Sequence, residues 1–407
     1  MSHYMPRGAA TLAALYFLSS ATTFFWAYMP RQMTGLGWTG AQIGMFFMLM
    51  TVGQALATPI WGRLADRRGG DSHSLLRAQY LIAAAAIVML PWATSWTFGV
   101  LIAVVVGATL RTSLPLVDAM ALREAGTGKF GRIRSFGTLG FGTVAIAFGL
   151  LGAFMDYGTM AKGAPWMMLI LLLAALPVVS RLPVARGGSS REVRPRRRES
   201  PAAPKMLDLL RRPVVVFVFP VAALFVATHV PYELFLVGLS EERGFGAWLP
   251  GLALFIGIMG ELFGFLSFRK FIRKMGAERV LLLVVGITGV RWLITGSTTS
   301  AIIFAGLQIL HGLTFAAFFL ALLELLTRHL GRAPGASAQG LLYLLVFATG
   351  SGLGTVISGF LYDLGSAATL FQQAGAASLV LLPALAVGLN LAERRAPAPS
   401  RELAMAE

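Results

Sequence analysis

The sequence contains no cysteine and few charged residues. The absence of cysteine excludes a disulfide framework, a thiolate nucleophile and a cysteine-ligated metal. Only 13% of the 407 residues are charged, whereas 56% are hydrophobic. This balance leaves too little polar surface for a soluble protein of this length.

Catalytic and energy-converting motifs are also missing. The five histidines are scattered, and no pair has the spacing of metal ligands. No Gly-Lys-Ser/Thr loop that could hold ATP phosphates occurs. No stretch between the apolar segments is long enough for a soluble output domain. These absences argue against an enzyme, a primary pump and a receptor, and they predict neither a cofactor nor a metal.

Long apolar stretches dominate what is present. A hydrocarbon core about 30 Å thick is spanned by about 20 residues of helix. Twelve such stretches occur, near residues 8–30, 41–62, 75–94, 97–121, 133–155, 164–183, 213–238, 247–269, 279–296, 300–326, 338–361 and 368–392. They are continuously apolar instead of alternating, which favours helices over a barrel. The sequence therefore predicts an all-α membrane protein with twelve transmembrane helices.

A basic stretch separates the apolar segments into six and six. We expect an N-terminal six-helix bundle at 1–183, a basic cytoplasmic linker at 184–212, and a C-terminal bundle with a short cytoplasmic tail at 213–407. Nucleic-acid binding would need a folded basic face with aromatic platforms. The run from Arg194 to Lys205 is instead interrupted by Pro and Ser. We interpret it as a tether attracted to anionic lipid, and we expect no nucleic-acid partner.

The positions of the 34 Lys and Arg residues predict the orientation. With the N-terminus in the cytoplasm, only Arg31, Lys162 and Arg243 fall outside, while Arg111 and Arg291 lie within apolar segments. The positive-inside rule then places both termini in the cytoplasm. The first segment lacks a cleavage site after a short core, so we expect a retained span. Composition suggests a bacterial inner membrane.

The most specific short string follows the second apolar segment and reads GRLADRRGG from Gly62. It resembles the loop signature of the major facilitator superfamily, in which Gly starts a tight turn. We expect Asp66 to accept backbone N–H groups at a helix N-terminus, and Arg67 and Arg68 to form a conformation-dependent charge latch. A degenerate copy runs from Arg269 to Gly276 and lacks the Asp. The two copies suggest a six-span repeat, hence two pseudo-symmetric bundles with a site between them at mid-membrane.

Ionisable residues inside spans are costly and mark candidate functional sites. Arg111 and Asp118 are seven residues apart on one face of the fourth span, and Arg134 begins the fifth. The strings PLVDA and FGRIRSFGTLGF are similar to those of the oligosaccharide, nucleoside and phenylpropionate proton symporters. This resemblance implies that Asp118 and Arg134 form a charge pair needed for substrate binding. An alternative for Arg134 is a cationic anchor at the membrane surface.

The second half supplies Tyr232, Glu233, Glu261, Arg291 and His311, and the strings around the last three are similar to motifs of the same group. In the lactose permease branch, a proton-carrying glutamate follows the span-ten histidine by one turn. Thr314 occupies that place here. In the lactose permease branch this histidine and glutamate couple transport to protons together. Here the glutamate is missing, so coupling by that pair is not expected.

Glu261 is the leading candidate for the proton carrier, because low-dielectric surroundings favour the protonated form of a carboxylate. An approach of Arg291 would favour release of the proton. Glu233 is the second candidate, with a span-end residue as its alternative. His311 could bridge the two carboxylates, since its ordinary pKa lies near neutrality, or could be a neutral structural residue.

Together these features predict a secondary active transporter that couples uptake of a small organic solute to protons by alternating access. Arg111, Asp118, Arg134, Tyr232 and Arg291 would bind a carboxylate-bearing aromatic, sugar or nucleoside. The alternative is a proton-antiport exporter of drugs or metabolites, although the fifth span lacks that branch's Gly-Pro-rich signature. We expect a monomer whose partners are substrate, protons and membrane lipids.

Overall fold

The computed structural model describes residues 7–68, 72–182, 209–330 and 340–395. These ranges are almost entirely helical and contain no strand. Twelve helices are long and apolar enough to cross a membrane, which confirms the predicted number of spans. Helices suit this environment because they satisfy their own backbone hydrogen bonds where no water is available.

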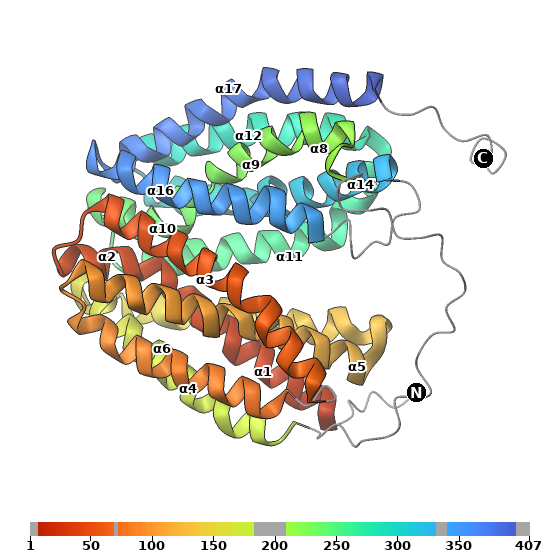
Figure 1. Cartoon of the computed structure of the whole chain (residues 1–407). Helices are drawn as coiled ribbons and strands as arrows, with labels where there is room; N and C mark the ends of the chain where they lie inside the picture. The colour runs from red at the N-terminus through yellow and green to blue at the C-terminus, as the bar shows by residue number, and fades with distance from the viewer. Residues whose placement is uncertain (1–6, 69–71, 183–208, 331–339, 396–407) are drawn as a thin grey trace, which may run out of the picture.

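The first six spans form the lower half of Figure 1, from red to yellow. They consist of α1 (Arg7–Phe24) with η1 (Phe25–Tyr28) and α2 (Met29–Gly35), then α3 (Gly40–Arg67), α4 (His73–Met89) with η2 (Leu90–Trp92), α5 (Trp96–Leu151) and α6 (Tyr157–Ser180). The helix α5 carries two consecutive spans, Trp96–Glu124 and Phe130–Leu151. We call this half the N bundle.

The last six spans form the upper half, from green to blue (Figure 1). Span seven is broken into α8 (Pro213–Phe217), α9 (Phe219–Ala227) and α10 (Val230–Glu242). It is followed by α11 (Leu249–Met275), α12 (Ala277–Ser297), α13 (Ala301–Gly306) with η3 (Leu307–Leu310), η4 (Gly312–Ala317) and α14 (Phe318–Leu330), η5 (Tyr343–Ala348) with α16 (Thr349–Asp363), and α17 (Ala367–Arg394). We call this half the C bundle.

The two ends of the spans define two faces. The terminal face is the end at which α1 begins and α17 ends, and the distal face is the opposite end. Side chains cap helices that start at the distal face. Thr39 forms a capping box with Gln42 before α3, Ser366 forms one with Thr369 before α17, and Asp156 caps α6. Such caps satisfy the N–H groups that a helix start leaves without intrahelical partners.

The bundles pack against each other in the distal half. The helix α3 packs on α16, and α5 packs on α11. One hydrophobic cluster fills the N bundle and continues into the distal half of the C bundle through residues such as Leu236 and Leu249. A separate cluster, which includes Leu281 and Leu322, fills the terminal half of the C bundle. The shared core therefore joins the bundles on the distal side.

Small residues allow this close packing. A Cβ on Gly44 would lie 2.9 Å from the carbonyl carbon of Thr355 and 3.3 Å from the Cα of Gly359. A Cβ on Gly251 would lie 2.6 Å from the Cα of Gly149. Real Cβ atoms do not approach a backbone so closely, so larger residues here would push the bundles apart.

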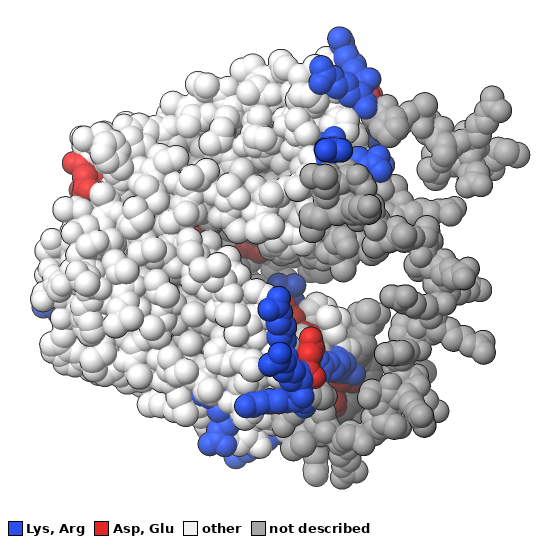
Figure 2. All heavy atoms as spheres, in the orientation of Figure 1, with Lys and Arg blue, Asp and Glu red and all other residues white. Residues whose placement is uncertain are grey.

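Charge and shape distinguish the two faces. Figure 2 shows Lys and Arg gathered at the terminal face, and a hollow between the bundles on the same side. At the distal end of the bundles, Arg31, Lys162 and Arg243 are the described basic residues. The protein therefore presents a basic, partly open face and a tightly packed face on which the described residues show no excess of positive charge.

The glycine of the GRLADRRGG string does not start a turn. Residues 62–67 continue α3, which ends at Arg67. Arg68 follows the helix and donates a hydrogen bond of 2.6 Å to the Ser74 hydroxyl. The expectation failed because Arg, Leu and Ala after Gly62 are good helix formers that prolong the helix. The predicted linker, 184–212, lies largely outside the described residues, so the bundle boundaries stay predictions.

Candidate functional site

A cavity of about 530 Å³ lies between the two bundles. Spans one, two, four and five contribute its N-bundle wall, and spans seven, eight, ten and eleven its C-bundle wall. Hydroxyl and amide groups are frequent in the lining, among them Ser19, Thr23, Thr51, Gln54, Ser351 and Thr355. Five ionisable side chains also line it, namely Arg111, Tyr232, Glu233, Glu261 and His311. A largely apolar cavity with a few charged and hydroxyl groups at this depth can bind and orient an organic solute.

Irregular helical turns carry several of these residues. Trp26 lies on the 3₁₀ turn η1, and Glu233 lies in the first turn of α10, which begins inside the membrane after a break at Thr228–His229. His311 stands between the 3₁₀ turn η3 and the π turn η4. Such interruptions free backbone groups and reorient side chains, and they are tolerated at membrane depth where they line a cavity. Pro231 and Gly312 are the local signals for these interruptions.

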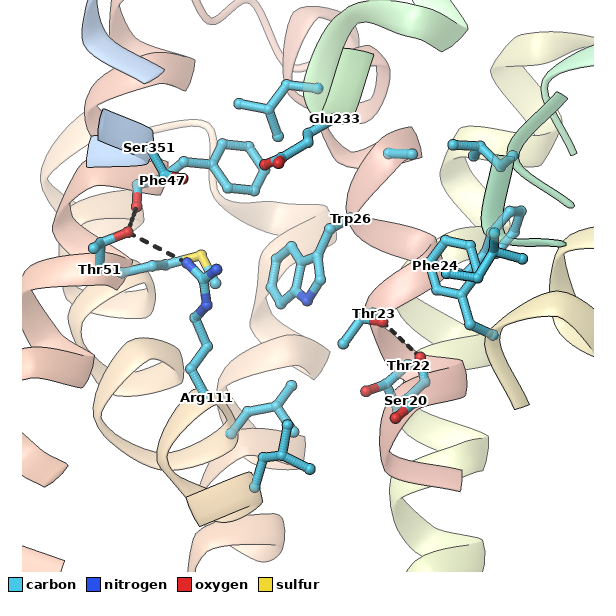
Figure 3. A pocket seen from close by; sticks show the side chains of 18 of the residues that line it. Ser20, Thr22, Thr23, Phe24, Trp26, Phe47, Thr51, Arg111, Glu233 and Ser351 are labelled. Atoms are coloured by element: carbon cyan, nitrogen blue, oxygen red, sulfur yellow. Dashed lines mark hydrogen bonds between the residues drawn. The ribbon is translucent and has the colours of Figure 1, made fainter. Parts of the chain in front are cut away.

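Arg111 extends from α5 into the cavity (Figure 3). Its guanidinium donates a long hydrogen bond of 3.4 Å to the Thr51 hydroxyl on α3. Trp26 lies beside it in the same view, and Glu233 approaches from the C bundle. The guanidinium thus keeps most of its donors directed to the cavity interior, where they suit an anionic group.

Glu261 and His311 face each other across α11 and span ten. The Glu261 Oε2 and His311 Nε2 atoms are 3.6 Å apart. The His311 ring packs against Tyr232, with ring centroids 4.7 Å apart, and stacks on Phe315 at 5.5 Å. The pair is mostly shielded, with 21% of the Glu261 side chain and 13% of the His311 side chain exposed. This arrangement brings the predicted proton carrier and the predicted bridging histidine together at the cavity wall.

Arg291 does not line this cavity. It is fully buried behind Tyr232 and donates hydrogen bonds to Gln308 Oε1 at 2.6 Å and Thr314 Oγ1 at 2.7 Å. Its guanidinium also lies 4.1 Å from the Trp292 ring centroid and 5.1 Å from that of Tyr232. In this conformation Arg291 is therefore held by neutral partners and not by Glu261. Thr314, which replaces the expected glutamate, is one of those partners.

Sequence reasoning missed Gln308. It is fully buried, and besides accepting from Arg291 it donates to the Phe304 carbonyl at 2.6 Å. A polar residue three positions before His311 in an otherwise apolar stretch was the available signal. Amides satisfy a buried guanidinium without adding charge, which explains why a search restricted to ionisable residues overlooks them.

Asp118 and Arg134 lie outside the cavity lining. Arg134 Nε is 3.9 Å from Asp118 Oδ1, and the Tyr16 hydroxyl donates to the same carboxylate oxygen. Nearly half of the Arg134 side chain is exposed, near the terminal face. The charge pair that the resemblance implied is present in the N bundle. Its role in substrate binding stays a prediction, because the cavity reaches Arg111 and not this pair.

The residues of the predicted latch lie at the terminal face. Gly62 and Asp66 line a small cavity of about 140 Å³, together with Trp61 and Arg123. Arg67 ends α3, and Arg68 bonds Ser74 at the start of α4. All of these contacts join helices within the N bundle. A latching role for them stays a prediction.

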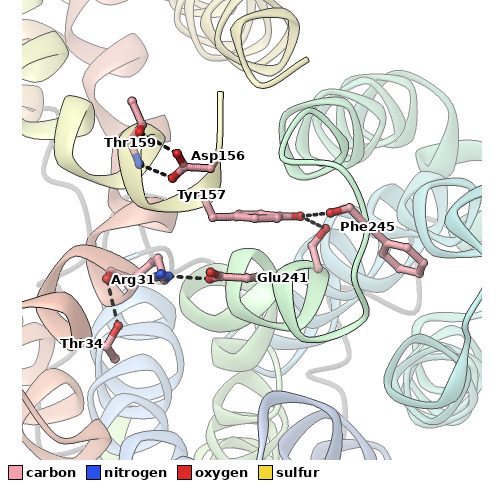
Figure 4. A network of polar contacts seen from close by, with 8 residues as sticks. Arg31, Thr34, Asp156, Tyr157, Thr159, Glu241 and Phe245 are labelled. Atoms are coloured by element: carbon pink, nitrogen blue, oxygen red, sulfur yellow. Dashed lines mark hydrogen bonds and ion pairs between the residues drawn. The ribbon is translucent and has the colours of Figure 1, made fainter. Parts of the chain in front are cut away.

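Polar bonds seal the distal face between the bundles. Arg31 Nε donates to Glu241 Oε2 at 2.5 Å, and the Tyr157 and Ser240 hydroxyls are 2.7 Å apart (Figure 4). Asp363 of α16 accepts from the backbone N–H groups of Gly40 at 2.5 Å and Ala41 at 2.7 Å. A C-bundle carboxylate thus caps the N-terminus of an N-bundle helix. The cavity is closed to this side by contacts that a rigid-body rotation of the bundles would break.

A contrasting carboxylate stands on the same face. Asp156 accepts from the Thr159 backbone N–H at 2.8 Å and from its hydroxyl at 2.9 Å (Figure 4). These hydrogen bonds, the backbone bond first, hold the pKa of the Asp156 carboxyl below its usual range. Asp156 caps its own helix α6 and, within the described ranges, forms no hydrogen bond or ion pair with the C bundle.

Two bundles of six helices around a shared polar cavity, open toward one face, define a solute carrier of the major facilitator type. Residues 10–373 match the model of the MFS_1 like family. The chain belongs to this family of the major facilitator superfamily, and it is a multi-pass membrane transporter. The recognised family and the predicted fold are both confirmed.

Known proteins similar to this chain are transporters. It is 25% identical over 350 residues to an uncharacterized transporter, YwbF, of Bacillus subtilis, covering 84% of this chain and 83% of the relative. It is 29% identical over 264 residues to a maltose permease of Geobacillus stearothermophilus, covering 63% and 62%. The solved structure of the nucleoside transporter NupG matches with a TM-score of 0.79 at 18% identity, covering 95% of this chain and 99% of that one.

A second solved structure shares the fold. A bacterial homolog of the human lysosomal transporter Spinster, in an inward-facing and unoccupied conformation, matches with a TM-score of 0.69 at 15% identity. It covers 98% of this chain and 100% of that one. At these identities the likeness concerns the fold alone.

Proposed function

We propose that this transporter couples uptake of a small organic solute to protons by alternating access of the two bundles. The observation that carries the proposal is the Glu261–His311 pair, which lies 3.6 Å apart in the wall of the cavity that also contains Arg111. A titratable pair and a solute-binding group in one cavity are what coupling needs. A maltose permease and a nucleoside transporter among the similar proteins support import of a polar solute.

In the proposed cycle, Glu261 carries the proton and His311 bonds the carboxylate. Arg111 binds an anionic group of the solute, and Tyr232 forms the wall between the cavity and Arg291. Solute and proton enter from the distal face when its polar bonds are broken, and they leave through the terminal face. The terminal face is the cytoplasmic one of an inner membrane, because it carries most of the described basic residues (Figure 2).

The first experiment measures proton movement in proteoliposomes that contain an internal pH dye. Sugars, nucleosides and aromatic acids are added outside one at a time, with protein-free liposomes as control. Internal acidification with one class of solute supports symport and identifies that class. Alkalinisation would instead support the alternative, proton-antiport export of drugs or metabolites. An unchanged internal pH across solutes that bind the purified protein would contradict coupling.

Glu261→Gln tests the carrier itself. The amide cannot cycle a proton, so we expect accumulation driven by a pH gradient to be lost while exchange between equal solute pools continues. The same substitution at Glu278, which pairs with Arg328 at the exposed terminal face, is the control and leaves both processes unchanged. Loss of both processes in Glu261→Gln, with the protein still folded, would assign Glu261 to binding or structure and refute its role as carrier.

A further inference from the structure

Two opposite charges face the cavity from opposite bundles. Arg111 belongs to the N bundle and Glu233 to the C bundle, and both side chains are directed to the interior (Figure 3). They are near enough for their charges to interact but form no ion pair. Arg111 has the single long bond to Thr51, and the Glu233 carboxylate has no hydrogen bond or ion pair with any described residue. Both side chains are exposed to the cavity, so both charges are available to a ligand that enters it.

Glu233 lies where a solute in the cavity can reach it. The helix α10 begins at Val230 inside span seven, and Glu233 lies in its first turn with its side chain exposed to the cavity. A carboxylate in this place can accept hydrogen bonds from a cationic group, and the opposite charges strengthen such a contact. Glu233 is therefore available to bind a cation.

Glu233 makes no direct contact with the pair assigned to coupling. The ion-pair contact of Glu261 is with His311, and no such contact links Glu233 to either of them among the described residues. Glu261 lies on α11 and His311 in span ten, whereas Glu233 lies on α10. The two carboxylates can thus have different tasks in one cavity.

The space around the two charges fits an organic solute and not a lone ion. Trp26 lies at the cavity wall beside Arg111 (Figure 3), where its ring face suits an apolar body or an ammonium group. Thr23, Thr51 and Ser351 supply hydroxyl groups around it. The cavity volume of about 530 Å³ leaves room for a body larger than the two charged groups alone.

We propose that the transported solute is a zwitterion whose carboxylate binds Arg111 and whose ammonium group binds Glu233. This inference rests on the proposed function, since it takes the cavity as the transport site. It narrows the expected carboxylate-bearing solute to one that also carries an amine. A solute of this kind bridges the two bundles and links its binding to their relative movement.

The test compares solutes that differ only in charged groups. The purified full chain is melted in detergent with L-phenylalanine, with 3-phenylpropionate, which lacks the amine, and with phenethylamine, which lacks the carboxylate. A second set, 6-aminohexanoate, hexanoate and hexylamine, separates the charges more widely. Maltose and uridine serve as neutral comparisons. We expect one zwitterion to raise the melting temperature, and its singly charged analogues to bind at least about tenfold more weakly.

Two variants locate the charges. Glu233→Gln should weaken binding of the zwitterion about ten- to a hundredfold and leave its amine-free analogue unaffected, because only the ammonium contact is lost. Arg111→Gln should weaken the zwitterion similarly and leave the carboxylate-free analogue unaffected. Glu278→Gln and Arg77→Gln make the same changes outside the cavity lining and serve as controls for folding.

Three results would overturn the proposal: no zwitterion of either set binds, an analogue with one charge or a neutral solute binds as tightly as the zwitterion, or both variants keep the zwitterion preference. The proton-flux measurement separates this failure from failure of the proposed function. If a zwitterion binds but no protons move, symport is refuted and the zwitterion proposal stands. If protons move with neutral or purely anionic solutes, the zwitterion proposal is refuted and symport stands.

Discussion

Two ionisable residues on one face of a helix can serve different sites because they lie at different depths. Arg111 and Asp118 do lie two turns apart on one helix. Seven residues also separate them by about 10 Å along the axis. Arg111 reaches the cavity, whereas Asp118 pairs with Arg134 and Tyr16 closer to the terminal face. Helical periodicity predicts a shared face, but only the packing of the bundles determines where a cavity opens along it.

Arg291 contributes to the stability of the C bundle through its contacts with neighbouring side chains. We expect Arg291→Lys to destabilise the protein by about 2 kcal/mol, because an ammonium group cannot reproduce the bonds to both Gln308 and Thr314 and the flat contact with Trp292. The melting temperature of the purified protein in detergent measures this.

Arg279→Lys is the matched control, since Arg279 is exposed at the start of the same helix. It should leave the melting temperature unchanged. An equal melting temperature for Arg291→Lys and the unmodified chain would show that the buried bonds contribute nothing to stability.

At the element scale, the number and order of spans follow from hydrophobic length alone. The interruptions in spans one, seven and ten do not. They coincide with the cavity residues Trp26, Glu233 and His311, and the apolar runs that contain them are as long as their neighbours. Hydropathy reports whether a segment crosses the membrane and is insensitive to the turn type within it.

The cap of α3 by Asp363 joins two elements of different bundles. Asp363→Asn removes the charge and one of two acceptor oxygens, so the distal face should open more often. Because the chain has no cysteine, Thr23→Cys in the cavity provides a single reporter. We expect a membrane-impermeant thiol reagent applied at the distal face to label it about tenfold faster in Asp363→Asn.

Asp156→Asn is the control for that measurement. Asp156 caps its own helix on the same face and has no hydrogen bond or ion pair with the C bundle among the residues that the structure describes. Its substitution should leave the labelling rate unchanged. If Asp363→Asn behaves like Asp156→Asn, the interbundle cap does not hold the distal face closed.

At the scale of the whole molecule, charge asymmetry predicts the orientation in the membrane. Single cysteines at Ser180, on the terminal face, and at Thr39, on the distal face, distinguish the two orientations in intact cells. An impermeant thiol reagent added outside should label Thr39→Cys only, because the positive-inside rule places the basic face in the cytoplasm. Labelling of Ser180→Cys alone would invert the topology and the proposed direction of transport.

The twelve spans, the two bundles and the superfamily could be predicted from the sequence because each rests on hydrophobic length or on short motifs. The composition of the cavity could be predicted only in part. Arg111, Glu261 and His311 line it as expected, whereas Arg291 turned out to be enclosed by neutral partners. Packing between distant segments determines which side chains line the cavity, and the local sequence contains little information about that packing.

The polar bonds that close the distal face also affect the lowest solute concentration at which the carrier can take up solute. These bonds join Arg31 to Glu241, Tyr157 to Ser240, and Asp363 to α3. A site that faces the distal side in only a small fraction of molecules shows an apparent Kd equal to its intrinsic Kd divided by that fraction. Each additional 1.4 kcal/mol held in the seal lowers the fraction about tenfold. A stronger seal therefore prevents leakage but weakens the apparent affinity for a solute at low concentration. The strength of these three contacts, which lie far from the cavity, determines the balance between the two effects.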